Sequence, residues 1–123
     1  MNITNTIIMK RQGFGESKIF KWDYSKKSDI LNIHKKNTIN AGGEEFGDVD
    51  IEFDKQGNVI GIEMMWASEF LAPTGITKKQ LEQLTNAEIV THQHTKETRL
   101  IWIKLGIPGK PEMILPLPTV LTA

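Results

Sequence analysis

The sequence predicts an α+β domain: mainly an antiparallel curled sheet or open barrel of about six to seven strands, with one short helix. Apolar and polar residues alternate along several short segments, which is the pattern of half-buried strands. Polar turns separate these segments in pairs, as in β-hairpins. One stretch alone, residues 76–84, has a helix-capping pattern followed by helical spacing of leucines. We expect a single domain over residues 1–123.

The first pair of strands covers residues 18–24 and 29–35, joined by the polar turn 25–28. In the first strand, aromatic side chains at every second position predict one buried face, formed by Phe20, Trp22 and Tyr24. In the second strand, Leu31 and Ile33 share a face. Residues 36–45 are predicted to be a polar loop, made flexible by two adjacent glycines.

Residues 48–64 are also predicted to pair as two strands around a tight turn. Three apolar residues alternate with four acidic ones up to Asp54, and Gly57 suits the positive-φ position of a tight turn. The return strand places Ile60, Ile62 and Met64 inward. Residues 66–71 are expected to form a short helical turn over the sheet.

These segments resemble a known family. WDYSKKSDILNI followed by GDVDIEFDKQGNVIGIEMMWASEFL is similar to the proteins of unknown function called DUF2283, over roughly Trp22 to Leu71. Gly61-Ile62-Glu63 and Ala67-Ser68 are the most specific matches, whereas Asn32 and Trp66 depart from the family pattern. The resemblance implies no activity and therefore no catalytic residue. Residues 18–71 would form the family-like part of the domain.

Residues 76–118 are predicted to add a helix, a second hairpin and an edge strand. Thr77 and Gln80 form a capping box at the start of the helix. The hairpin pairs residues 87–95 with 98–105, and prolines in the last strand suit the edge of a sheet. The predicted core comprises Trp22, Tyr24, Leu31, Ile33, Val49, Ile51, Phe53, Ile60, Ile62, Met64, Phe70, Leu81, Leu84, Val90, Ile101 and Ile103.

Composition argues against several classes of protein. Fifteen basic and fifteen acidic residues balance, so no global field favours nucleic acid. The absence of cysteine excludes disulfides and thiolate sites. No apolar run is long enough for a membrane span, and the first residues lack a signal-peptide pattern. We therefore expect a cytoplasmic protein without a membrane partner, whose native start is either Met1 or Met9.

An acidic stripe is the first candidate site. Asp48, Asp50, Glu52 and Asp54 lie on one face of their strand, with Glu63 on the return strand nearby. Such carboxylates could bind a hard cation or act as an acid and base. Alternatively they form a solvated face, or pair with lysines on neighbouring strands. We favour the solvated face.

The second candidate site is His92-Gln93-His94, where two imidazoles share a strand face, a spacing that metal sites use. A third ligand would have to come from His34 or Glu97. The alternative is a polar rim on an outer hairpin. We expect no catalytic residue and no cofactor, with His92 and His94 as the metal candidates.

The third candidate is a basic group near aromatic residues, which is typical of surfaces that bind single-stranded nucleic acid. It comprises Lys26, Lys27, His34, Lys35 and Lys36. Because Trp22 and Tyr24 alternate as core residues do, we expect nucleic-acid binding less than the other functions.

From these features we expect a small non-catalytic module for interaction with other macromolecules, one that self-associates. Apolar residues outside the predicted core, Met65, Leu100, Trp102 and the Leu115–Leu117 tail, predict a homodimer. A small metal protein or enzyme using His92 and His94, or Asp48, Asp50 and Glu52, is the alternative. A nucleic-acid binder using the lysines is the third hypothesis.

Overall fold

A computed structural model describes residues 13–96 and 98–122, with side chains up to Leu117. Within these residues, nine strands form two antiparallel sheets. The strands are β1 (Phe14–Glu16), β2 (Phe20–Ser25), β3 (Ile30–Lys35), β4 (Gly42–Phe46), β5 (Val49–Phe53), β6 (Val59–Met64), β7 (Asn86–Gln93), β8 (Thr98–Gly106) and β9 (Met113–Thr122). The choice between Met1 and Met9 as the native start concerns residues outside the described part.

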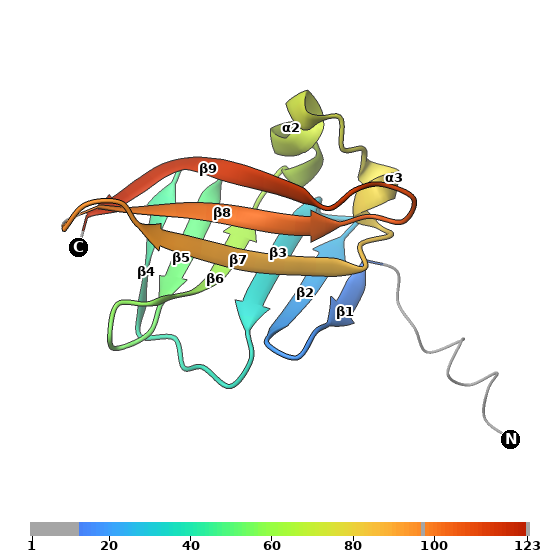
Figure 1. The fold of residues 1–123 in the computed structure, drawn as a ribbon. Helices are drawn as coiled ribbons and strands as arrows, with labels where there is room; N and C mark the ends of the chain where they lie inside the picture. The colour runs from blue at the N-terminus through green and yellow to red at the C-terminus, as the bar shows by residue number, and fades with distance from the viewer. Residues whose placement is uncertain (1–12, 97, 123) are drawn as a thin grey trace, which may run out of the picture.

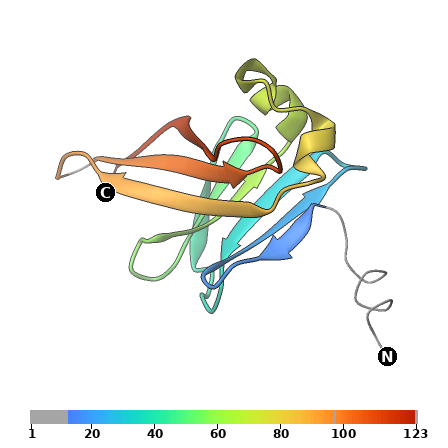
Figure 2. The ribbon, with the colours of Figure 1, turned by 45° about the vertical axis from the view of Figure 1, so that its right-hand side comes forward.

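The two sheets correct the prediction of one curled sheet or open barrel. The first has the order β1-β2-β3-β6-β5-β4, and the second has the order β7-β8-β9. β6 returns to pair with β3, so the two predicted hairpins merge into one sheet. The hairpin predicted over residues 87–105 does not extend that sheet but lies across its face, where β7 contacts β2, β3 and β6 (Figures 1 and 2).

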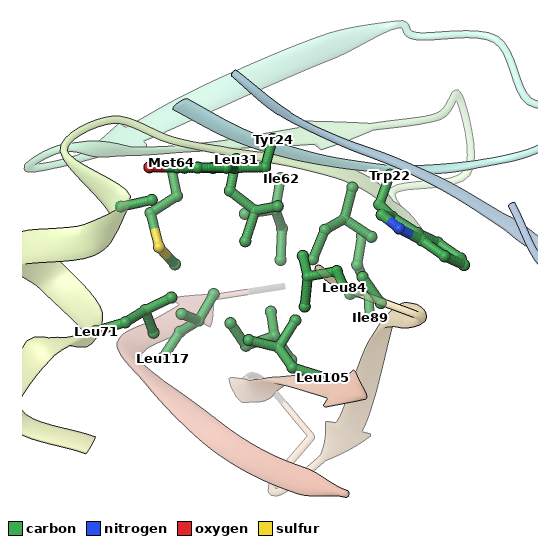
Figure 3. Packing of buried hydrophobic residues seen from close by; sticks show 14 of the residues in the cluster. Trp22, Tyr24, Leu31, Ile62, Met64, Leu71, Leu84, Ile89, Leu105 and Leu117 are labelled. Atoms are coloured by element: carbon green, nitrogen blue, oxygen red, sulfur yellow. The ribbon is translucent and has the colours of Figure 1, made fainter. Parts of the chain in front are cut away.

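The core lies between the two sheets, because each sheet turns its apolar face toward the other. The first sheet supplies Trp22, Tyr24, Leu31, Ile33, Val49, Ile51, Ile62 and Met64, and the second supplies Ala87, Ile89, Ile101, Ile103, Leu105 and Leu117. Leu71, Leu81 and Leu84 from the connecting segment belong to the same cluster, and Figure 3 shows Leu71 and Leu84 between the side chains of the two sheets. One cluster of buried side chains therefore joins both halves of the described chain.

Two strands were not predicted. β4 occupies part of the segment expected to be a loop, and β1 precedes the first predicted hairpin. Both are edge strands, and the side chains of β4 are mostly exposed. An edge strand is held by hydrogen bonds between backbone groups, which need no particular side chains. Without a buried apolar stripe, such a strand shows no alternation of apolar and polar residues in the sequence.

The face of β7 was also predicted wrongly. Val90 was assigned to the core, but Ile89 is buried opposite Ile103, while Val90 pairs with Trp102 on the outer side and is 39% exposed. β8 was predicted correctly, since Ile101 and Ile103 are buried. A shift of one residue exchanges the two faces of a strand, so the adjacent pair Ile89-Val90 left the choice open.

Two further core assignments need correction, because Phe53 and Phe70 are half-buried and pack against the core from its margin. The assignment of Ile60 is confirmed, since its side chain is 1% exposed. Val59, which was not assigned to the core, is also buried; the β5–β6 pairing is irregular between Glu52 and Phe53, so that Phe53 faces Val59.

The helices are short. α2 (Ala67–Leu71) runs into the 3₁₀ turn η1 (Ala72–Thr74), and α3 (Lys78–Leu81) is shorter than the helix predicted over residues 76–84. The capping box is confirmed, since Thr77 accepts from the Gln80 backbone and Gln80 accepts from the Thr77 backbone. Among the described residues, no helix has the length and apolar character to cross a membrane.

Candidate functional site

The outer face of the six-stranded sheet is the polar side of the molecule. The register aligns two rows of side chains across all six strands. One row contains Phe14, Asp23, Asn32, Glu63, Asp50 and Glu45, and the other contains Glu16, Lys21, His34, Gly61, Glu52 and Gly43. Two of the four predicted stripe residues, Asp50 and Glu52, therefore lie in adjacent rows in the middle of this face.

His34 and Glu52 meet above Gly61. His34 Nδ1 lies 3.5 Å from Glu52 Oε1, although the two residues belong to strands on either side of β6. The contact depends on the missing side chain, since a Cβ at Gly61 would overlap the Glu52 carboxylate and lie 3.1 Å from His34 Nδ1. The sequence analysis missed this pair. The sequence feature that could have indicated this pair is Gly61, the single glycine in a strand of otherwise larger residues.

Both members of the pair have a second partner. Asn40 donates to Glu52 Oε2 at 2.8 Å, and the Thr38 hydroxyl lies 3.3 Å from His34 Nε2. Thr38 donates its proton to the Lys35 carbonyl at 2.7 Å, so its hydroxyl is not directed to give that proton to the imidazole. The Thr38 hydroxyl, the His34 imidazole and the Glu52 carboxylate therefore do not act together as an activated nucleophile.

Asp50 and Glu52 do not meet lysines on neighbouring strands, which corrects one interpretation of the acidic stripe. Asp50 faces Glu63 and Glu45 in the register, and its buried Oδ1 has no hydrogen-bond partner in the described structure. Asp48 is exposed in the turn before β5. Asp54 is tied into the β5–β6 turn, where hydrogen bonds from the backbone N–H groups of Asn58 and Gln56 hold its pKa below the usual range.

The two predicted metal ligands, His92 and His94, are exposed on and just beyond β7. His92 packs edge-on against Trp102, with ring centroids 6.3 Å apart. His34 lies on the outer face of the other sheet, so the sandwich separates it from them. Glu97 is outside the described residues. In the part of the chain that is described, no three His, Asp or Glu side chains are grouped to hold a metal.

The basic residues do not form one patch. Lys26 and Lys27 lie in the β2–β3 turn, whereas Lys35 and Lys36 lie at the opposite end of β3. Lys26 is 3.8 Å from Glu82, and Lys36 forms a 2.6 Å contact with Glu16 that lowers the pKa of that carboxyl. Because Trp22 and Tyr24 are buried, they cannot stack with bases.

Asp29 is the one buried acidic residue among those described, at 7% exposed. Tyr24 donates to its Oδ1 at 2.6 Å, Ser68 donates its backbone N–H to the same oxygen, and the Ser68 hydroxyl donates to Oδ2. Burial raises the pKa of Asp29, but these hydrogen bonds outweigh burial and hold it below the usual range. Burial and the bond to Asp29 raise the pKa of Tyr24. The network joins the β2–β3 turn to α2 and is structural.

The outer face of the three-stranded sheet is apolar. Its apolar part comprises Val90, His92, Leu100, Trp102, Ile114 and Pro116, with the charged residues Glu88 and Lys104 at one end, and we call it the outer β7–β9 face. Ile114 is 61% exposed. The residues used to predict a dimer do not share one surface. Leu117 is buried and Leu115 packs against the chain's own core, while Leu100 and Trp102 lie on this outer face.

Residues 21–68 match the family model described as "Protein of unknown function (DUF2283)". The matched region extends from β2 to the start of α2, and so includes Tyr24, Asp29, Gly61 and Ser68. This confirms the resemblance seen in the sequence. No curated protein and no solved structure matched the chain.

Proposed function

We propose that this protein is a non-catalytic interaction module whose outer β7–β9 face binds a second copy of the same chain. The observation that carries the proposal is the apolar character of that face. Val90 and Trp102 are direct register partners, and Ile114 extends the surface onto β9. A contiguous apolar surface on a sheet is typical of a protein interface.

The polar residues of the same face favour a self-complementary contact. Glu88 and Lys104 are register partners beside Ile114. Lys104 lies 3.6 Å from Glu112 of the same chain, and in a two-fold contact it would exchange this partner for the Glu88 of the other copy. Pro116 and Pro118 lack N–H groups, so addition of a strand along the β9 edge is disfavoured and face-to-face packing is left.

The size of the face predicts a weak dimer. Three strands about 4.8 Å apart, with about 3.3 Å per residue, give a face on the order of 15 by 30 Å. This is about half of the roughly 800 Å² that each partner contributes to a standard interface. An interface of this size belongs to the weak and transient class, so we expect dilution to separate the copies.

Sedimentation equilibrium of the full chain, over about three decades of protein concentration up to the millimolar range, tests the proposal. Wild type is expected to shift from monomer to dimer. Ile114→Lys should remain monomeric, because it places a second positive charge beside Lys104 on the apolar face. Ile39→Lys is the matched control, since Ile39 is 80% exposed in a loop away from the face and its change should leave the dimer intact. A monomeric wild type at every concentration, or equal behaviour of the two variants, would refute the proposal.

The enzyme and metal alternatives have less support. The imidazole of His34 and the carboxylates of Glu52 and Asp29 have partners that suit structural contacts. Elemental analysis of untagged protein separates the alternatives, because stoichiometric metal that His92→Ala removes would establish a metal protein instead.

A further inference from the structure

A pocket of about 350 Å³ beside α2 has a chemistry distinct from that of the outer β7–β9 face. Its lining residues are Asp48, Trp66, Glu69 and Phe70. Among the residues that the structure describes, two aromatic rings and two carboxylates line it. α2 and its flanks stand at the upper edge of the sandwich in Figure 1.

The backbone fixes Trp66 at the mouth of this pocket. Its φ is 54°, in the left-handed region that bulky residues rarely adopt, and this reverses the chain between β6 and α2. Two bonds hold the reversal: Met65 N–H donates to the Asp48 carbonyl at 2.8 Å, and Ala67 N–H donates to the Asp29 carbonyl at 2.9 Å. The side chain is turned outward as a result and is 58% exposed.

The groups of this pocket are unpaired within the chain that the structure describes. Neither Asp48 nor Glu69 forms a salt bridge there, and the indole of Trp66 has no ring or cation contact. An aromatic face attracts a cation through its quadrupole, and Trp is the best of the aromatic residues at this. Nearby carboxylates add a longer-range attraction.

We propose that this pocket binds an alkylated ammonium group, with the methyl groups against Trp66 and Phe70 and the charge near Asp48 and Glu69. A primary ammonium or metal ion would fit less well, because strongly hydrated cations lose more by leaving water for an aromatic surface. The same head group occurs on free small cations and on methylated lysine side chains.

Titration followed by ¹H–¹⁵N NMR tests the proposal with three probes: tetramethylammonium, a short peptide containing trimethyllysine, and the same peptide with the uncharged tert-butyl isostere. Both cations should shift the indole N–H of Trp66 and the amides of α2, and the isostere should bind at least about tenfold more weakly. Equal binding of the charged and uncharged peptides would overturn the proposal, as would shifts located elsewhere or no shifts at all.

The two cationic probes distinguish the source of the head group. A peptide that binds at least about tenfold more tightly than tetramethylammonium identifies a protein side chain, because neighbouring peptide contacts then contribute. Equal affinities identify a free small cation. Either result supports the site.

Matched variants assign the role of each group. Trp66→Gly removes the indole and relieves the left-handed backbone, so it should fold at least as well as wild type and lose roughly tenfold in affinity. Glu69→Gln should lose a few-fold, and the loss should shrink at high salt. Glu44→Gln, on exposed β4, is the control and should bind as wild type does. Retained affinity in Trp66→Gly would contradict the proposal even if the probes bind.

Discussion

Ser68 donates both its hydroxyl and its backbone N–H to the carboxylate of Asp29, at 2.7 and 3.0 Å, across 39 residues of sequence. The Asp29 carbonyl also accepts the N–H of Ala67 at 2.9 Å. Asp29 thus occupies the place of a helix-capping residue for α2, although it belongs to the β2–β3 turn. Its φ of 57° turns the carboxylate toward α2.

We predict that Asp29→Ala lowers the free energy of unfolding by about 3 kcal/mol. The change leaves the buried Tyr24 hydroxyl and the Ser68 N–H unpaired, and it places alanine in a left-handed conformation. Asp29→Asn keeps a side-chain acceptor and tolerates that conformation, so it should lose only about 1 kcal/mol. Urea denaturation followed by circular dichroism measures both.

Asp48→Ala is the control for these changes, because Asp48 is exposed and its loss should alter stability by less than about 0.5 kcal/mol. Equal stability of Asp29→Ala and Asp48→Ala would show that the network contributes nothing.

At acid pH, wild type and Asp29→Asn should no longer differ in their free energy of unfolding. Hydrogen bonds from Tyr24 and Ser68 hold the pKa of Asp29 below its ordinary range despite burial, which by itself raises it. The folded state therefore binds fewer protons than the unfolded state, so the stabilisation is complete above the unfolded pKa of about 3.9 and is lost as pH falls through the lower folded value.

Urea midpoints of the two proteins, compared from neutral pH downward, measure this loss. The gap between them should stay constant to about pH 5 and then narrow. A gap that widens toward low pH would mean that the folded-state pKa of Asp29 is raised instead.

Strand pairs with a regular apolar stripe could be predicted from sequence, and the contacts between distant elements could not. The alternation of Trp22 with Tyr24 and of Leu31 with Ile33 fixed the buried face of β2 and β3. Nothing local indicated that β6 pairs with β3, or that β7–β9 packs across the first sheet. Those arrangements depend on which apolar faces bury each other, and several arrangements bury similar area.

For the candidate sites, too, local features could be predicted from sequence, whereas contacts between distant elements could not. Asp50 and Glu52 were correctly placed on the outer face, because strand parity is local. The partner of Glu52 was not foreseen, since His34 reaches it across a third strand. The pocket at Trp66 depends on a backbone reversal that has no glycine or asparagine to mark it in the sequence.

Two glycine positions on the six-stranded sheet should differ in how much stability an alanine costs. A Cβ at Gly15 would lie 2.7 Å from Cζ2 of the buried Trp22 ring, which packed neighbours hold in place. We predict that Gly15→Ala lowers the free energy of unfolding by about 1–3 kcal/mol. At Gly61 the overlap is with the Glu52 carboxylate, the end of a flexible side chain, so Gly61→Ala should change stability by less than about 1 kcal/mol.

Urea denaturation compares the two glycine variants, and NMR of the His34 ring reports the separation of His34 from Glu52 in Gly61→Ala. A larger loss of stability at Gly61 than at Gly15 would show that the His34–Glu52 contact is rigid.

The last prediction tests the register of β7, where sequence and structure disagree. Ile89 is buried opposite Ile103, and Val90 faces outward beside Trp102. Ile89→Ala should therefore lower the free energy of unfolding by about 2–4 kcal/mol by leaving a cavity between the sheets. Val90→Ala should lower it by less than about 1 kcal/mol in the monomer, yet weaken the proposed dimer. Unfolding at protein concentrations below the dimerisation range measures the stability of the monomer, and sedimentation at concentrations above it measures the strength of the dimer. The reverse order of stabilities would place Val90 in the core and shift β7 by one residue.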